Sequence, residues 1–306
     1  MSAVLPAADA VVRGLIYIGL LLLIGSQTAR TLVTRALAAH ADLEPPIRDR
    51  VVRLAPRLML PLLALFLARG ALQVLSLLDP GDSLTFDVVR SVLLSSPWGR
   101  AWLLQLGAAA LLVAALRFRG SATKWSDLPA NLILAVLIWA QTGMGHAATN
   151  RWPGPLGRVL DSVHLLGAGL WLGTLSALAI FALPLLHGDR RLAALARVVR
   201  AFSLYARTGV SLVVISGAVA ALVYAGSINA LLAATWGRLL LIKLVGMLGV
   251  LALGWYNWRV VTPALDGMHP DARARLRIAI RLELLLALAM LAITTMLVVS
   301  PLPGEG

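Results

Sequence analysis

Long apolar stretches recur along the whole chain and are separated by short polar breaks. Several reach the roughly 20 residues that an α-helix needs to cross about 30 Å of hydrocarbon. Of the 306 residues, 59% are hydrophobic and 13% are charged, and the mean hydropathy is +0.86. A segment in lipid has to satisfy its own backbone hydrogen bonds, and an α-helix does so. The sequence therefore predicts an all-α, polytopic membrane protein.

We expect eight transmembrane helices. Their predicted bounds are residues 12–32, 57–77, 101–116, 128–146, 159–185, 205–224, 238–258 and 278–299. In domain terms, residues 1–127 form an N-terminal membrane half with the first three helices and a loop, and residues 128–306 form a membrane core with the last five.

Positive charge is unevenly divided between the polar breaks. The breaks after odd-numbered helices hold 19 Lys and Arg, whereas the opposite side holds six. The positive-inside rule then places both termini outside the cytoplasm, in the periplasm for a multi-pass protein of a bacterial inner membrane. The net charge of +13 is spread over short loops and not over one continuous face, so we expect membrane lipid and no nucleic acid as a partner.

The two halves of the chain share a short string. Trp98-Gly99-Arg100 opens the third expected helix and Trp236-Gly237-Arg238 opens the seventh, with Gln105 and Lys243 at matching positions. Four helices repeated in the same orientation form a parallel repeat, a plan found in some transporters. We therefore predict two four-helix repeats, roughly residues 1–150 and 151–306. The alternative is an interfacial Trp anchor used twice.

Several kinds of chemistry are excluded by what the sequence lacks. It contains no Cys, which rules out disulfides and thiolate metal ligands. It has no Walker A string, dinucleotide fingerprint, HExxH string or nucleophile elbow. We expect a protein that is not an enzyme, in which a soft metal would be bound by His and Met.

Two histidines lie at similar depth on the outer side. His146 ends the fourth expected helix in the string TGMGHAA, and His164 lies one to two turns into the fifth. A short loop joins these helices, so the two imidazoles are expected to face one another as metal ligands. Imidazole suits copper, zinc, nickel and iron, and the thioether of Met144 would favour Cu(I). Asp161 precedes His164 by three residues and is a candidate to orient its imidazole.

Each of these residues also has a structural interpretation. A lone His in a membrane helix is often hydrogen-bonded to a neighbouring helix, Met144 is most simply a packing residue, and Asp161 would equally cap a helix N-terminus. The same His pair would also serve as axial ligands of a b-type haem between the fourth and fifth helices, which makes a membrane redox protein the alternative function.

Among the further polar residues inside the expected helices, five are singled out. Because polar groups in hydrocarbon are costly, they are candidates for a transport path. They are Arg69, Gln105, Gln141, Lys243 and Glu283. Glu283 lies nearest the cytoplasm and is a candidate inner relay or ion-binding carboxylate. The alternative is buried ion pairing that fixes the helix register.

Four strings together resemble the copper resistance protein D (CopD) family. They are TGMGHAATN, VHLLGAGLWLGTLSAL, TWGRLLLIKLVGML and RLELLLALAMLAITTMLVVSPLP. The resemblance is strongest from residue 128 to the end, which makes the expected core CopD-like. It carries onto His146, His164, Trp171, Lys243 and Glu283 as motif positions.

The resemblance implies an eight-helix inner-membrane protein that handles periplasmic copper, usually beside a small periplasmic copper-binding protein of the CopC type. It implies that Cu⁺ or Cu²⁺ is accepted outside and moved inward. The resemblance, together with the imidazole donors of His146 and His164, makes copper transport from that site toward the cytoplasm the expected function. A further alternative is a factor that delivers copper to another membrane enzyme without transporting it.

Overall fold

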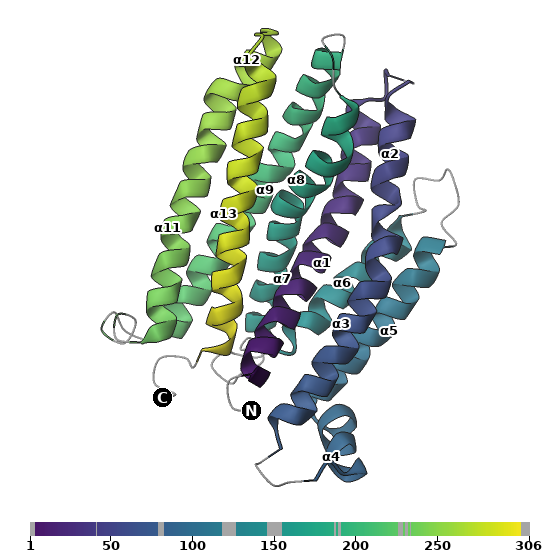
Figure 1. Cartoon of the computed structure of the whole chain (residues 1–306), viewed down its shortest axis with the longest axis vertical. Coiled ribbons are helices and arrows are strands. Elements are labelled where there is room, and N and C mark those ends of the chain that lie inside the picture. Colours follow the sequence, from purple (N-terminus) through teal and green to yellow (C-terminus); the bar gives the residue numbers. More distant parts are fainter. Residues whose placement is uncertain are drawn as a thin grey trace. The chain divides into compact units, whose positions relative to one another are not determined.

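The computed structural model describes residues 4–40, 42–78, 83–117, 127–145, 155–186, 188, 191–225, 229, 232 and 234–300. Throughout these ranges the regular structure is helical, and no strand occurs in them (Figure 1). The chain divides into two compact units. Unit 1 comprises Met1–Leu20 and Pro56–Leu165, and unit 2 comprises Leu21–Ala55 and Leu166–Gly306. The expected domain boundary at residue 127 stays a prediction.

Unit 1 contains the first part of α1 (Val4–Ala36) and most of α3 (Leu54–Ser76) and α7 (Leu156–Ala168). Its other elements are α4 (Phe86–Arg90), the π-helix η1 (Ser91–Ser95), α5 (Pro97–Arg117) and α6 (Leu128–Thr142). The start of α5 has a clear local cause. Proline suits the first helical position, and the Ser96 hydroxyl accepts a hydrogen bond from the Gly99 N–H at 2.9 Å. α5 then packs on α6.

Unit 2 contains the rest of α1 and α7 and several further elements. They are α2 (Glu44–Val52), η3 (Gly169–Gly173), α8 (Thr174–Ala177), η4 (Leu178–Ala182), η5 (Leu183–Leu185), α9 (Leu192–Ala225), α11 (Thr235–Tyr256), η7 (Asn257–Val261), α12 (Thr262–Asp266) and α13 (Ala272–Val299). η3, η4 and η7 are π-helical, and η5 is a 3₁₀-helix. Figure 1 shows α11 and α13 side by side, and they pack along their lengths.

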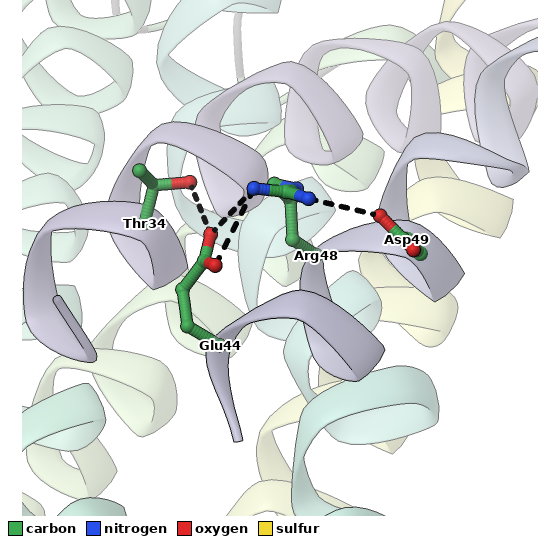
Figure 2. Close-up of polar contacts among 4 residues, drawn as sticks. All are labelled: Thr34, Glu44, Arg48 and Asp49. Atoms are coloured by element: carbon green, nitrogen blue, oxygen red, sulfur yellow. Dashed lines mark hydrogen bonds and ion pairs between the residues drawn. The ribbon is translucent and has the colours of Figure 1, made fainter. Parts of the chain in front are cut away.

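The turn from α1 to α2 is held by polar contacts. Glu44 opens α2 ahead of two prolines, and its Oε1 accepts hydrogen bonds from Thr34 Oγ1 of α1 at 3.1 Å and from Arg48 at 3.2 Å (Figure 2). Arg48 also reaches Asp49 at 3.4 Å. A carboxylate in the first turn complements the helix dipole, so the sequence itself defines this helix start.

Within unit 2, the second half of α1 touches η3 backbone to backbone. A Cβ atom on Gly25 would overlap the backbone of Gly173, and one on Gly173 would overlap the Leu21 carbonyl. Small residues permit such close approach between membrane helices. The contact positions η3, which carries Trp171, two residues before Gly173.

Among the described residues, six helical stretches are long and apolar enough to cross a membrane. They are Val4–Ala36, Glu44–Ser76, Pro97–Arg117, Leu156–Leu185, Leu192–Tyr224 and Thr235–Asp266. Large apolar side chains such as Leu60 and Leu222 are more than three-quarters exposed, as lipid-facing residues are. These features agree with the expected all-helical, multi-pass membrane protein.

The other two expected spans also lie in helices. The fourth falls in α6, which is only 15 residues long, and the eighth falls in the 28 residues of α13. Eight crossings, and periplasmic termini, therefore stay predictions. So does the four-helix repeat, although both WGR strings begin at the second residue of a helix, α5 in one case and α11 in the other.

Candidate functional site

A buried guanidinium stands at the centre of the polar residues of unit 1. Arg69 of α3 is 2% exposed. Its Nη1 donates a hydrogen bond to Gln141 Oε1 of α6, and its Nη2 donates one to the Met144 carbonyl, each at 3.3 Å. No carboxylate in the described ranges forms an ion pair with it. Neutral oxygens therefore solvate this charge, which burial would otherwise make very costly.

Gln105 of α5 joins the same cluster. It is completely buried, and its Nε2 donates to Gln141 Oε1 at 2.6 Å. That single oxygen thus accepts from two helices at once. Three of the five polar residues expected along a transport path are thus joined through Gln141, because Arg69 and Gln105 both donate to its Oε1.

Two tryptophans of α5 border this cluster. Trp98 and Trp102 stack with ring centroids 6.5 Å apart, and the Arg69 guanidinium carbon lies 5.8 Å from the Trp98 ring centroid. The Trp102 indole N–H donates to the Phe66 carbonyl at 2.8 Å. Gly70 provides the space for that indole, because a Cβ there would meet its ring.

Three polar atoms of this cluster are buried without a hydrogen-bond partner among the described residues. They are Arg69 Nε, Trp98 Nε1 and Gln105 Oε1. Buried polar atoms in proteins are nearly always paired, and those left over are usually satisfied by ordered water or a ligand. The cluster therefore has hydrogen-bonding capacity beyond what its own side chains use.

The end of α6 leads directly to the first candidate histidine. α6 ends at Thr142, and the described residues continue to Gly145, so His146 itself lies outside them. The Met144 carbonyl is held by Arg69, and its side chain is buried in an apolar cluster with Ala101 and Trp102. The packing interpretation of Met144 fits that environment.

The second candidate histidine lies on α7, close to contacts with α6. The hydroxyls of Thr142 and Ser162 are 3.1 Å apart, which joins the end of α6 to the first turns of α7. Arg158 adds to this joint: its Nη2 donates to the Trp139 carbonyl at 3.0 Å, and its guanidinium lies 4.2 Å from the Trp139 ring centroid. His164 and Asp161 are both half-buried on α7.

Unit 2 contains a buried carboxylate, as unit 1 contains the buried guanidinium of Arg69. Glu283 of α13 is 4% exposed, and its Oε1 accepts a hydrogen bond from the side-chain amide of Asn257. The Trp171 side chain donates a further hydrogen bond to it. No basic side chain among the described residues forms an ion pair with Glu283. Neutral donors thus hold the negative charge, as neutral acceptors hold Arg69.

Both donors lie in π-helical turns. Trp171 is in η3, and Asn257 is the first residue of η7. π-Helical turns are frequent at functional sites, because the extra residue re-aims a side chain that a regular α-helix would direct elsewhere. Trp171 is buried against Val250 and Met290, which fixes its indole between α11 and α13.

Lys243 does not belong to this group. It is half-buried on α11, 14 residues before Asn257, a rise of about 21 Å along the helix. Within unit 2, Lys243 therefore lies about 21 Å along the helix from the Asn257 that contacts Glu283.

Sequence reasoning missed Asn257. Its signal was present, because Asn257 is an amide side chain inside the seventh expected span, where each polar group is a candidate. The neighbouring Tyr256 and Trp258 made the segment resemble an interfacial belt.

No group of three or more His, Asp or Glu side chains with metal-site spacing occurs within the described ranges. Those ranges omit His146, so the expected His pair remains untested by this observation. The chain offers imidazole and thioether donors near residues 144–164, which is the donor chemistry suited to copper.

Comparison with known proteins identifies the family. A copper resistance protein D-like N-terminal domain matches residues 4–157, and the copper resistance protein D family matches residues 196–297. No curated protein and no solved structure matches the chain. His164 and Trp171 lie between the two matched segments, whereas Lys243 and Glu283 lie inside the second. Because the two matches together extend over most of its length, the chain belongs to the copper resistance protein D family.

Proposed function

We propose that this protein accepts copper, as Cu⁺ or Cu²⁺, outside the cytoplasm at His146 and His164 and transports it across the inner membrane toward the cytoplasm. Copper is its substrate, and it catalyses no covalent reaction. Family membership supports a role in copper resistance, and the apolar helices support a membrane location. A small periplasmic copper-binding protein of the CopC type is the proposed donor.

The observation that carries the proposed binding site is the contact between Thr142 and Ser162. Thr142 is four residues before His146, and Ser162 is two residues before His164. Their hydroxyls are 3.1 Å apart, so the two histidine-bearing segments start from adjoining positions. We propose that the two imidazoles meet there, where together they would supply half or more of a copper coordination sphere.

Arg69 gives this site a rigid base. Its hydrogen bond to the Met144 carbonyl holds the chain two residues before His146, while its bond to Gln141 ties that point to α6. A metal site binds tightly when the shell behind its ligands is fixed before the metal arrives. Asp161, one turn before His164, is the proposed acceptor for the His164 imidazole N–H, and Met144 is the proposed thioether for Cu⁺.

The inward step is proposed to use Glu283. Its carboxylate is buried and held by the neutral donors Asn257 and Trp171, so its charge is not cancelled by a basic side chain among the described residues. A carboxylate in that condition attracts a cation or a proton strongly, because a low-dielectric environment weakens screening. We assign it the role of inner relay or ion-binding group. Gln105, Gln141 and Lys243 complete the proposed path.

Metal content and an ultraviolet-visible spectrum of detergent-purified protein test the binding site. We expect copper in the wild type and none in the His146→Ala, His164→Ala double variant, with the same elution volume for both. The matched control is His269→Ala, because His269 is exposed and far along the sequence from the site. It should keep its copper.

Two results would contradict the proposed site. Equal copper in the double variant and the wild type would remove both histidines as ligands. A Soret band that disappears in the double variant would instead identify a haem protein.

A further inference from the structure

Unit 2 contains a pocket near the starts of α9 and α13. Figure 1 shows that these two helices begin at the same end of unit 2. Its volume is about 290 Å³, and it lies between η4, η5, the first turns of α9 and the first half of α13. The lining residues divide into two kinds. The apolar ones are Ala179, Leu183, Pro184, Leu186, Leu195, Leu276, Ile280 and Leu284, and the charged ones are Arg273, Arg277 and Arg281.

The three arginines occupy a single face of α13. They are spaced at four-residue intervals, so their side chains follow one another along the helix. Among the described residues that line the pocket, none is acidic. The positive charge of the three arginines is therefore concentrated and is not balanced by a carboxylate of that described lining.

Arg273 helps to build the pocket. Its Nη1 donates to the Leu186 carbonyl at 2.7 Å, and its Nη2 donates to the Gly188 carbonyl. These bonds tie the turn after η5 to the start of α13. Its Nε is buried and has no acceptor among the described residues. One polar atom of the pocket wall is thus left to be satisfied by something other than the described protein atoms.

Arg277 and Arg281 do not build the pocket in this way. Both are exposed, and in the described part of the chain neither forms a hydrogen bond or an ion pair. Two guanidinium groups one turn apart offer paired donors in the geometry that phosphate oxygens match.

Along α13 the apolar lining residues alternate with the arginines, and Leu284 lies beyond the last of them, about 16 Å from Arg273 along the helix axis. A pocket wall that presents guanidinium groups next to aliphatic side chains matches a molecule with an anionic head and an apolar tail. The positive-inside rule places the start of α13 on the cytoplasmic side, where such molecules face protein from the membrane leaflet.

We propose that this pocket binds one anionic phospholipid, with its phosphate on Arg277 and Arg281 and an acyl chain against Leu276, Ile280 and Leu284. The charge of the arginines selects an anionic headgroup over a zwitterionic one. The proposal does not rest on copper transport, since no residue of the pocket belongs to the copper site or path.

Native mass spectrometry of the full chain in detergent tests the proposal, with dioleoylphosphatidylglycerol and dioleoylphosphatidylcholine as probes. We expect one phosphatidylglycerol to bind the wild type in preference to phosphatidylcholine. The Arg277→Gln, Arg281→Gln double variant should bind phosphatidylglycerol about twenty-five-fold more weakly, because each basic contact with an anionic lipid contributes roughly a five-fold factor.

Matched variants separate this site from general charge. The Arg275→Gln, Arg197→Gln double variant removes the same charge from exposed positions outside the pocket and should bind like the wild type. The Arg277→Lys, Arg281→Lys variant should retain most of the binding. Equal weakening in both Gln variants, or equal affinity for the two lipids, would overturn the proposal. So would displacement of bound lipid by millimolar inorganic phosphate alone, which would assign the pocket to a free anion.

Discussion

Units 1 and 2 each bury a charge, and the two charges are opposite in sign. In unit 1, Arg69 is held by the oxygens of Gln141 and Met144, and in unit 2, Glu283 is held by the donors Asn257 and Trp171. Neither charge is neutralised by an ion pair in the described ranges. A guanidinium remains charged under all ordinary conditions, whereas a carboxylate can take up a proton or a cation.

This difference separates two roles. A permanent charge tied to neutral oxygens is suited to fixing structure, and Arg69 does so for the segment that leads to His146. A carboxylate held by neutral donors can exchange what it binds without losing its hydrogen bonds. We therefore expect Arg69 to have a structural role in unit 1, and the role proposed for Glu283 in unit 2 is the exchange of a bound cation or proton.

Substituting Gly25→Ala should produce the largest effect, and it should fall on unit 2. The added methyl would overlap the Gly173 backbone, and such overpacking against backbone should destabilise the protein by about 3 kcal/mol. It would also displace Trp171 from Glu283. The midpoint of thermal unfolding in detergent measures the loss. Gly107→Ala is the control, because nothing lies within 4 Å of a Cβ there. Equal midpoints for the two variants would contradict the close contact.

Substituting Arg69→Met tests the structural role in unit 1. The Met144 carbonyl would lose its donor inside the protein, at a cost of about 2 kcal/mol. A lower midpoint of thermal unfolding is the expected result. Arg48→Met makes the same change at a side chain that is 39% exposed and paired with Glu44 at 3.2 Å, and it should shift stability by less than about 1 kcal/mol. If the two variants were equally stable, Arg69 would have no architectural role.

Substituting Glu283→Gln tests whether the Glu283 carboxylate takes part in copper transfer in unit 2. Glutamine retains an oxygen that accepts from Asn257 and Trp171, so folding and copper binding should be preserved. The loss of the negative charge should slow copper transfer by about ten-fold, equivalent to about 1.4 kcal/mol in the barrier. Transfer into proteoliposomes measures this rate. Asp266→Asn, at a surface pair with Arg200 of 3.2 Å, should transfer normally. Loss of copper binding in Glu283→Gln would make Glu283 a ligand instead of a relay.

Substituting Thr142→Val should give the smallest effect. It removes the hydroxyl contact between α6 and α7 and should weaken copper binding about three-fold, less than 1 kcal/mol. Thr295→Val is a matched control. Both hydroxyls donate to the carbonyl three residues earlier, and only Thr142 also contacts another helix. A copper titration compares them, and equal affinities would show that the contact does not position the histidines.

Sequence reasoning predicted the features that depend on hydropathy and charge. The long apolar runs predicted membrane helices, and the structure is helical there. The polar residues inside those runs included Arg69, Gln105 and Gln141, which the structure joins through Gln141. The helix α5 begins at Pro97, four residues before the expected bound at residue 101, although Ser96 and Pro97 are local signals for a helix start.

Features that depend on how helices are rotated against one another were not predictable. Asn257 reaches Glu283 because η7 is a π-helical turn, and periodicity based on 3.6 residues per turn does not show where such a turn begins. The contact of Gly25 with Gly173 has the same origin. A glycine permits close approach of another backbone, but its partner is set by tertiary packing.

The most direct test of the central claim is copper uptake into liposomes that contain the purified protein, with the His146→Ala, His164→Ala variant and empty liposomes beside it. The account predicts inward copper accumulation with the wild type and uptake at the level of empty liposomes with the variant. Wild-type protein that binds copper, yet takes up no more than empty liposomes, would contradict transport and identify the chain as a copper-delivery factor.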